Sequence, residues 1–397
     1  MPRPIRPAAW IHGSLGFGGG ERVLIEQVRA LAPRGNPVDV FTVGMPGPQD
    51  LVDAVRAANP HVRDVGRLDG SGDIARTLAR RGYEAVFTCW STRAYRGIER
   101  LRQRPFARRP VVLETVHERY GWCFRDHEDR RREQVDFWLA TYDFVGGLRR
   151  AFDLPADRVA VTRPLFPALL PPARAHDAGR ALRRTLGIPD DAVVVGYAGR
   201  LSGNKGLHDV VPAVARIAAR GADVHLLLAG RIAPPSPAYE ARLGAAVAAA
   251  TTGPDAPLRG RLHLVGPLPD VHPVYAAADV VPLLSSMEGL FPLMLVEAMA
   301  HGVAVVTTDV GGIGTCLRDG VDAAVVRKLP DDELDATPAV VAAFEARLER
   351  LVVDAAERRR LGDAGRARVH ALVAANDFHG DTLRAYERAL ALGRLRR

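Results

Sequence analysis

The stretch AVVVGYAGRLSGNKGLHDVVPAVARIAARGADVHLLLAG, residues 192–230, decides the fold. It contains a short apolar run at 192–199, a glycine-rich turn that opens a helix, and a second apolar run at 223–230. Short buried strands that alternate with amphipathic helices are typical of parallel βαβ units. We therefore expect a parallel sheet with helices on its faces.

The same alternation runs through both halves of the chain. In the first half, the apolar runs that predict strands lie at residues 7–13, 37–44, 84–90, 110–117, 137–143 and 158–165. In the second half, they lie at residues 192–199, 223–230, 261–266, 279–284, 303–308 and 323–327. The pattern after residue 331 predicts helices only. The predicted fold class is α/β, with two doubly wound parallel-sheet domains and a helical C-terminal tail.

Residues 166–187 interrupt the alternation, because Pro167, Pro171 and Pro172 disfavour both a helix and a central strand. We expect an N-terminal domain at residues 1–166, a linker at 167–187 and a C-terminal domain at 188–375. Residues 376–397 are expected to form a helix that packs back on the N-terminal domain. Two such domains form a cleft, and ligands of open α/β sheets bind outside the carboxyl ends of the strands.

The composition limits the class of protein. Hydrophobic residues make up 47% and charged residues 25% of the 397 residues, which is ordinary for a globular chain too long for one core. No apolar run reaches the roughly 18 residues that a membrane-spanning helix needs. No apolar signal-peptide core follows the N-terminus, so we expect a cytoplasmic protein. The three cysteines are far apart, which suits neither a disulfide framework nor a metal site.

The net charge of +8 indicates an anionic partner. Nucleic acid is one candidate, but the chain has no basic tail, zinc spacing or ladder of basic and aromatic residues. An anionic small molecule or an acidic membrane surface explains the charge as well. Residues 102–109, RQRPFARR, are a candidate for peripheral contact with acidic lipid, and a solvated helix end explains them too.

A glycine-rich turn, GSLGFGGGER at residues 13–22, follows the first predicted strand. Its glycines let the backbone approach a bulky anion, and the helix that opens here offers N–H groups. The dinucleotide fingerprint fails, because Glu21 stands where the third glycine is needed. A flexible strand-to-helix turn is the alternative interpretation.

A second turn, GYAGRLSGNKG at residues 196–206, carries Arg200 and Lys205. Lys205 is one of only two lysines in the chain, the other being Lys328. The P-loop pattern fails because Asn204 precedes this lysine. A planar guanidinium, a point-charge ammonium and helix-end amides together suit a diphosphate. Two solvated surface cations are the alternative.

A third segment, EGLFPLMLVEAMAH at residues 288–301, places Glu297 inside an otherwise apolar helix. A buried carboxylate needs a partner, and a ribose diol can provide two hydroxyl donors. A salt bridge on the helix face is the alternative. Glu288 and Gly289 precede the helix, where backbone N–H groups can also meet a sugar. His117 ends the strand predicted at 110–117, and a satisfied core or surface histidine is its alternative role.

Together these segments resemble the retaining glycosyltransferases of family four, which have the GT-B fold of two Rossmann-like domains facing a cleft. The resemblance rests on GGGERVL at residues 18–24, on GRLSGNKG at 199–206 and on VYAAADVVPLLSSMEGLFPLMLVEAMAHGVAVVTTDVGG at 274–312. It implies a nucleotide-sugar donor linked to UDP or GDP and bound mainly by the second domain. It implies no cofactor.

The resemblance also implies roles for single residues. Arg200 and Lys205 match the pair that holds the donor diphosphate, and Glu297 matches the glutamate that binds the ribose. Glu288 resembles the glutamate that contacts the donor sugar, and His117 resembles a histidine that touches the same sugar. Catalytic roles are thus expected of Arg200, Lys205, His117 and Glu288. Donor-binding roles are expected of Gly18, Gly19, Gly199, Gly289, Leu290, Phe291 and Glu297.

Two positions depart from the family pattern. Glu288 and Glu297 are nine positions apart, one more than the usual spacing, and Gly289 occupies the expected place. Either a one-residue bulge restores Glu288, or the turn at residues 289–291 shares the acidic role. Thr315 stands where the family often has a glutamate.

We predict transfer of a sugar, with retention at the anomeric carbon, to an acceptor hydroxyl on a small molecule, glycan or lipid. The resemblance implies that the leaving phosphate takes the acceptor proton, which makes a metal unnecessary. The acceptor is expected near Trp90, Glu114, Glu118 and Arg119, and a homodimer is left open. Two alternatives remain, namely a nucleotide-sugar epimerase or hydrolase on the same fold, and a non-catalytic protein that binds nucleotide sugars or nucleic acid.

Overall fold

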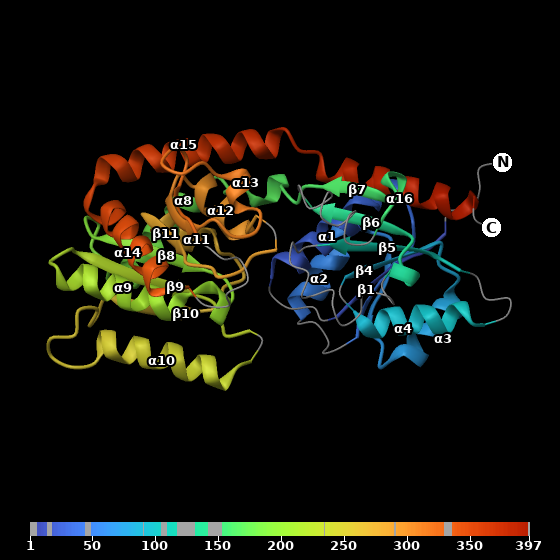
Figure 1. Cartoon of the computed structure of the whole chain (residues 1–397), viewed down its shortest axis with the longest axis horizontal. Helices are drawn as coiled ribbons and strands as arrows, with labels where there is room; N and C mark the ends of the chain where they lie inside the picture. The colour runs from blue at the N-terminus through green and yellow to red at the C-terminus, as the bar shows by residue number, and fades with distance from the viewer. Residues whose placement is uncertain are drawn as a thin grey trace. The chain divides into compact units, whose positions relative to one another are not determined.

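The computed structural model describes residues 6–13, 18–43, 49–89, 91–104, 109–116, 132–141, 153–233, 235–289, 291–328 and 336–395. The chain divides into two compact units (Figure 1). Unit 1 comprises Met1–Pro164 and Asp377–Arg397, and unit 2 comprises Leu165–Asn376. Each unit is built on its own parallel sheet, as the alternating pattern predicts.

The sheet of unit 1 has seven described strands in the order β3-β2-β1-β4-β5-β6-β7. They are β1 (Ala8–His12), β2 (Val38–Thr42), β3 (Val62–Arg67), β4 (Ala85–Cys89), β5 (Val111–Val116), β6 (Phe137–Thr141) and β7 (Val159–Thr162). The strand order reverses at the β1–β4 pair, which is the doubly wound arrangement expected from the sequence. β3 was not predicted, because this edge strand contains Arg63, Asp64 and Arg67 and has no apolar run.

Helices cover both faces of this sheet. They are α1 (Gly19–Ala30), α2 (Gln49–Ala58), α3 (Ser71–Arg81) and α4 (Thr92–Arg102), with short turns η1 (Ala32–Arg34) and η2 (Ala156–Arg158). Alternate residues of β1 face opposite sides. Ala8 and Trp10 pack in the core that includes α1 and α2, and Ala9 and Ile11 pack in the core that includes α3 and α4.

The last helix, α16 (Phe378–Leu395), packs on unit 1 although it follows unit 2 in the chain. It lies against α1, β5 and β7. Its Tyr386 is fully buried, stacks on Phe87 with ring centroids 5.9 Å apart, and donates a hydrogen bond of 2.6 Å to Glu84. These apolar and polar contacts fix the helix on the sheet of unit 1.

The sheet of unit 2 has six described strands in the order β10-β9-β8-β11-β12-β13. They are β8 (Val193–Ala198), β9 (Val224–Ala229), β10 (Leu262–Gly266), β11 (Val280–Leu283), β12 (Ala304–Thr308) and β13 (Ala324–Val326). All six coincide with predicted strands. The helices and helical turns of the unit are η3 (Pro167–Leu169), α8 (Ala175–Thr185), η4 (Gly203–Lys205), α9 (Leu207–Ala219), α10 (Pro237–Thr251), α11 (His272–Ala277), α12 (Leu293–Ala300), α13 (Ile313–Cys316), α14 (Pro338–Val353) and α15 (Ala355–Ala374).

The segment at residues 167–187 was expected to be a linker without a helix. In the structure, residues 175–185 of this segment form the helix α8. The three prolines of this segment all precede the helix, so they restrict only its approach. Gly179 of α8 packs so closely on α11 that a Cβ there would lie 2.6 Å from the Cβ of Ala276. In the part of the chain that the structure describes, no helix has the length and apolar character needed to span a bilayer.

Candidate functional site

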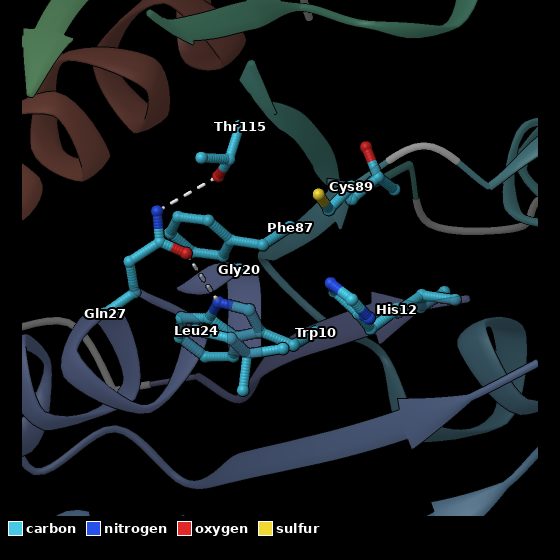
Figure 2. A pocket seen from close by; sticks show the side chains of 10 residues that line it. Trp10, His12, Gly20, Leu24, Gln27, Phe87, Cys89 and Thr115 are labelled. Carbon is cyan, nitrogen blue, oxygen red and sulfur yellow. Dashed lines mark hydrogen bonds between the residues drawn. The ribbon is translucent and has the colours of Figure 1, made fainter. Parts of the chain in front are cut away.

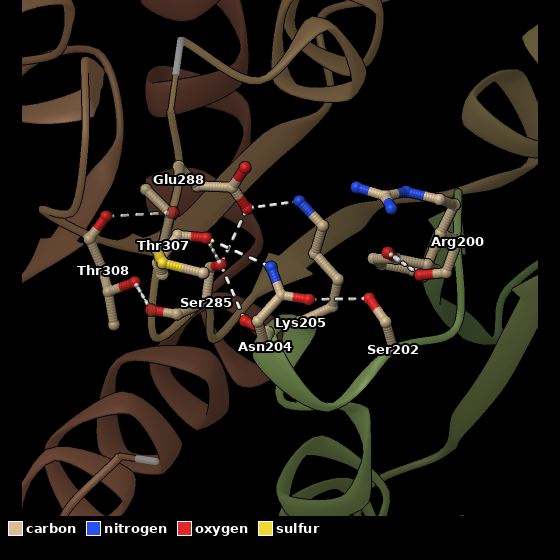
Figure 3. A network of polar contacts seen from close by, with 10 residues as sticks. Arg200, Ser202, Asn204, Lys205, Ser285, Glu288, Thr307 and Thr308 are labelled. Carbon is tan, nitrogen blue, oxygen red and sulfur yellow. Dashed lines mark hydrogen bonds and ion pairs between the residues drawn. The ribbon is translucent and has the colours of Figure 1, made fainter. Parts of the chain in front are cut away.

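Three loops of unit 2 meet where neighbouring strands end. β8, β11 and β12 are adjacent and parallel, so the segments that follow them share one edge of the sheet. These segments are residues 199–206, 284–289 and 309–312. Figure 3 shows that side chains from the first two segments point toward one another, with the end of β12 beside them.

Lys205 is positioned by the tight turn that opens α9. The turn η4 ends at Gly206, which has a φ of 69° that favours glycine. A Cβ at Gly206 would also overlap the carbonyl oxygen of Leu284, so the turn presses directly on the segment after β11. The side chain of Lys205 is 11% exposed. Two loops distant in sequence thus form one surface.

The ammonium of Lys205 forms an ion pair with Oε1 of Glu288. The Glu288 side chain is 10% exposed, so both charges are largely removed from water. Ser285 Oγ lies 2.7 Å from the same carboxylate oxygen. The acidic group that faces Lys205 is therefore Glu288 itself, even though its spacing to Glu297 is one residue longer than the family pattern.

The turn after β12 supports Glu288 from another direction. Gly311 has a φ of 62°, and a Cβ there would lie 2.9 Å from the Cβ of Glu288. Thr308, the last residue of β12, donates a hydrogen bond of 2.6 Å to the carbonyl of Ser285. The position of the carboxylate is thus determined by contacts from three separate loops.

Arg200 lies just beyond β8, and its side chain is exposed. Its carbonyl accepts a hydrogen bond of 2.8 Å from the hydroxyl of Tyr197, which is fully buried. Burial, and next the charge of Glu288, raise the pKa of Tyr197 well above its ordinary value, so the phenol remains a hydrogen-bond donor. Figure 3 shows the Arg200 guanidinium extended toward the Lys205 ammonium. Among the described residues, no carboxylate lies within 4.0 Å of that guanidinium.

The other residues of unit 2 that are predicted for donor binding lie close to this site in the sequence. Gly199 has a φ of 159°, and a Cβ there would lie 3.0 Å from the hydroxyl of Tyr197. Phe291 is fully buried ahead of α12, and Glu297 on α12 is 3% exposed. Gly289 directly follows Glu288, and Leu290 lies outside the described residues.

Unit 1 has its own pocket at the ends of β1, β4 and β5 (Figure 2). Gly18 caps α1 in an extended conformation, Gly19 is the first helical residue, and Gly20 lines the pocket. The other lining residues are Trp10, Ile11, His12, Leu24, Gln27, Phe87, Thr88, Cys89 and Thr115. Trp10 and Phe87 stack with centroids 4.3 Å apart, which makes the floor of this pocket aromatic.

Most of the expected acceptor residues fall outside the described part of the chain, namely Trp90, Glu118 and Arg119, as does His117. Glu114 is described, and its carboxylate is completely buried in unit 1. It accepts hydrogen bonds from Thr88 and, at 2.7 Å, from the hydroxyl of Tyr95. The structure therefore places Glu114 among internal partners rather than at a surface.

The candidate lipid contact at residues 102–109 is described only at its ends. Arg102 donates to the carbonyls of Glu133 and Gln134 and forms a 3.1 Å ion pair with Asp136. These contacts use the guanidinium of Arg102 within unit 1. In the described ranges, no group of three or more His, Cys, Asp or Glu residues could hold a metal ion.

Sequence reasoning missed Ser285 and Thr308, which contact the predicted site. Each is a polar residue at or just after the carboxyl end of a strand, a position that could have drawn attention to it. Their contacts join residues 23 positions apart, however, and no local pattern reports such a pairing.

A family model described as "Glycosyl transferases group 1" matches residues 192–345. This stretch contains Arg200, Lys205, Glu288 and Glu297. Over this stretch the resemblance to glycosyltransferases, inferred above from the sequence motifs, is confirmed.

Named relatives align mainly over part of the chain. A D-inositol 3-phosphate glycosyltransferase of Stackebrandtia nassauensis is 33% identical over 219 residues, which is 52% of this chain and 43% of that protein. A lipopolysaccharide 1,2-N-acetylglucosaminetransferase of Salmonella typhimurium is 34% identical over 149 residues, or 35% of this chain and 36% of that protein. The matches thus span less than half the length of these relatives.

Solved structures match nearly the whole chain. Anabaena HepE, in a complex with UDP and glucose, has a TM-score of 0.73 and 18% identity over 96% of this chain and 98% of that one. The sucrose-phosphate synthase of Thermosynechococcus elongatus has a TM-score of 0.69 and 23% identity, and the match covers 96% of this chain and 98% of that one. At these identities the likeness concerns the fold, and it confirms the predicted GT-B fold.

Proposed function

We propose that this protein is a retaining glycosyltransferase that moves a sugar from a UDP- or GDP-sugar to an acceptor hydroxyl. The observation that carries the proposal is the grouping of Arg200, Lys205 and Glu288 at the strand ends of unit 2. All three residues lie inside the stretch that matches the glycosyltransferase family. Two cations and a carboxylate provide the chemistry that a sugar diphosphate needs.

The two cations have different environments, and this difference suits them to separate tasks. Arg200 is exposed and extends toward Lys205, so its planar guanidinium can bind two phosphate oxygens. Lys205 is buried against Glu288. An ammonium has three N–H donors, so Lys205 can keep Glu288 as a partner while it donates to a phosphate.

The cations favour the reaction by stabilising the leaving group. When the bond between the sugar and the β-phosphate breaks, negative charge grows on the phosphate. Fixed cations at this position stabilise that charge without reorganisation. At about 4 Å and an effective dielectric constant near 20, one cation contributes roughly 4 kcal/mol before desolvation. The leaving phosphate then takes the proton of the acceptor hydroxyl on the same face, which gives retention.

The donor and the acceptor are supported to different degrees. UDP is the nucleotide bound in the HepE structure, which favours UDP as the first donor to test. The names of two relatives refer to an inositol phosphate and to a lipopolysaccharide. We therefore leave the acceptor at the class of small molecule, glycan or lipid.

Replacement of Arg200 by alanine tests the proposal most directly. Arg200→Ala removes an exposed side chain that has no ion-pair partner among the described residues, so the fold should persist. Sugar transfer from the preferred donor should fall by about 10²–10³-fold. Arg259→Ala is the matched control, because Arg259 is exposed in the same unit but precedes β10 at the opposite edge of the sheet.

The donor is first identified with a thermal-shift panel of UDP-, GDP-, ADP- and dTDP-sugars, because a ligand that binds the folded state raises Tm. Products are then analysed with and without an acceptor. Sugar transfer that needs an acceptor and is lost with Arg200 supports the proposal. Acceptor-independent epimerisation or hydrolysis would favour the alternative enzyme class, and near-normal transfer by Arg200→Ala would overturn the proposed role of the site.

A further inference from the structure

The two oxygens of the Glu288 carboxylate have different surroundings. Oε1 is paired with the Lys205 ammonium and lies 2.7 Å from Ser285 Oγ. Oε2 has no hydrogen-bond or ion-pair partner in the described part of the chain. Figure 3 shows this second oxygen turned away from the lysine and the serine. The carboxylate is thus held through one oxygen and presents the other.

Ser285 is itself held rigidly. It is completely buried, and its carbonyl accepts the 2.6 Å hydrogen bond from Thr308. The backbone N–H of the next residue, Ser286, donates a 2.9 Å hydrogen bond to the carbonyl of Asn204. The serine therefore occupies a fixed position between the loop that carries Lys205 and the end of β12.

The hydroxyl of Ser285 has one proton and three acceptors within reach. Oε1 of Glu288 lies at 2.7 Å, the carbonyl of Asn204 at 2.8 Å and the carbonyl of Met287 at 3.0 Å. A hydrogen bond to an ionised carboxylate is roughly twice as strong as one to a neutral carbonyl. We therefore assign the hydrogen bond donated by the Ser285 hydroxyl to Oε1 of Glu288.

We propose that Ser285 is a positioning residue that directs Oε2 of Glu288 at a hydroxyl group of the donor sugar. The inference rests on the proposed function, because Glu288 is the group expected to meet that sugar. The hydroxyl of Ser285 keeps Oε1 occupied when the Lys205 ammonium also binds a phosphate. Without it, the carboxylate can rotate about its terminal torsion, which is broad for glutamate, and bring both oxygens to the lysine.

This role separates binding of the sugar from binding of the nucleotide. The sugar depends on the orientation of Oε2, whereas a nucleoside diphosphate depends on Arg200 and Lys205. Loss of the Ser285 hydroxyl should therefore weaken the sugar-bearing donor selectively. A merely structural role would weaken the nucleotide and the nucleotide sugar together.

The experiment compares Ser285→Ala with Ser286→Ala. Ser286 is 3% exposed and its hydroxyl has no partner in the described structure, so it is a matched neighbouring serine. Calorimetric titration with UDP and with UDP-glucose is the measurement. For Ser285→Ala we expect UDP affinity within twofold of wild type and UDP-glucose affinity and kcat/KM at least tenfold lower, with neither changed in Ser286→Ala. Equal losses for both ligands, or no loss, would overturn the proposal.

A second measurement tests the contact without any ligand. Double-mutant cycles pair Glu288→Gln with Ser285→Ala and with Ser286→Ala, and urea unfolding gives the stability of each variant. We expect non-additive shifts for Ser285 and additive shifts for Ser286. Additivity in both cycles overturns the role of Ser285 and leaves the proposed function in place. A wild-type chain that binds no nucleotide sugar overturns the proposed function, whatever the cycles show.

Discussion

The charged site at the strand ends of unit 2 differs from the pocket at the strand ends of unit 1. In unit 2, the loops after β8 and β11 bring Arg200, Lys205 and Glu288 together. In unit 1, the ends of β1, β4 and β5 surround an aromatic stack and a neutral amide. There the side chain of Gln27 donates to Thr115 at 3.0 Å and accepts from Trp10 at 3.4 Å. Both sheets have the same strand order, but the lining of the described pocket in unit 1 contains no Arg, Lys, Asp or Glu.

Under the proposed function, this difference favours separate tasks for the two edges. A diphosphate needs cations, and the described pocket of unit 1 offers none with a fixed charge, because His12 is the only basic residue in its lining. Unit 2 keeps its cations in place through a buried ion pair and shared loops. We therefore expect the loss of a charge in unit 2 to lower the unfolding free energy strongly. Changes to neutral residues in unit 1 should alter it only slightly.

The largest expected effect comes from removing one half of the ion pair. Lys205→Met leaves the Glu288 carboxylate buried without its partner, which costs about 3–5 kcal/mol of unfolding free energy. The double variant Lys205→Met with Glu288→Gln removes both charges and should regain most of that loss, while sugar transfer remains abolished. Urea unfolding and an activity assay on the same samples are the measurements.

Thr115→Val is the corresponding change in unit 1, where it removes a neutral partner of Gln27. It should cost only about 1–3 kcal/mol, since no buried charge is left unpaired. If Lys205→Met proved no more costly than Thr115→Val, the pair with Glu288 would be a weak surface contact, and the contrast between the units would not hold.

Acid should affect unit 2 before unit 1. In unit 2, burial and then the charges of His272 and His176 lower the pKa of His301 from 6.5 to about 4. The distance between His272 Nδ1 and His301 Nε2 is 3.0 Å. The folded chain therefore keeps His301 neutral. The contribution of neutral His301 to the unfolding free energy, on the order of 3 kcal/mol, is complete above pH 6.5. It is lost as the pH falls from 6.5 toward 4.

In unit 1, the corresponding group is a carboxylate. Burial raises the pKa of Glu26, but hydrogen bonding to His379 and the charge of Arg29 outweigh burial and lower it below 4.5. The contribution of the ionised Glu26 to the unfolding free energy is present above pH 4.5 and is lost only below that value. Unit 1 should therefore retain its stability at a pH at which unit 2 has already lost part of its own.

Urea unfolding at pH 7.5 and 5.5, with hydrogen exchange read separately for peptides of each unit, measures this difference. His301→Gln should reduce the pH dependence of unit 2. The exposed His61 in unit 1 provides the control variant His61→Gln, which should leave the dependence unchanged. Equal acid sensitivity of both units would show that neutral His301 is not what separates them.

Local pattern was sufficient for most of the fold but not for its polar contacts. Apolar runs report burial, so all six strands of unit 2 were predicted, whereas the charged edge strand β3 was not. Helix α8 was missed because the prolines at 167–172 were taken to extend their effect over residues that they do not restrict. The first error arises because an edge strand need not contain an apolar run, and the second because the effect of the prolines was extended too far along the chain.

The site shows the complementary limit. Arg200, Lys205 and Glu288 could be named from the sequence because they follow strands, and the structure brings Lys205 and Glu288 together. The acceptor role expected of Glu114 stays a prediction; the structure shows that its strand is buried on both faces and that its carboxylate is internal. Contacts such as Ser285 with Thr308 depend on strand order in space, which single-sequence patterns do not determine.

The smallest expected effect concerns the glycine turn of unit 1. Gly20 lies in the first turn of α1, and a Cβ there would meet nothing within 4 Å. Gly20→Ala should therefore raise the unfolding free energy by about 0.5–1 kcal/mol, because alanine loses less conformational entropy in a helix. Gly311→Ala in unit 2 should do the opposite, since its Cβ would crowd Glu288 at a positive φ.

Thermal unfolding with and without UDP measures both variants. UDP affinity should be unchanged in Gly20→Ala, because the proposed nucleotide site uses the cations of unit 2. A loss of UDP affinity in this variant would mean that the neutral turn also contacts the nucleotide, and the division of tasks between the units would have to be redrawn.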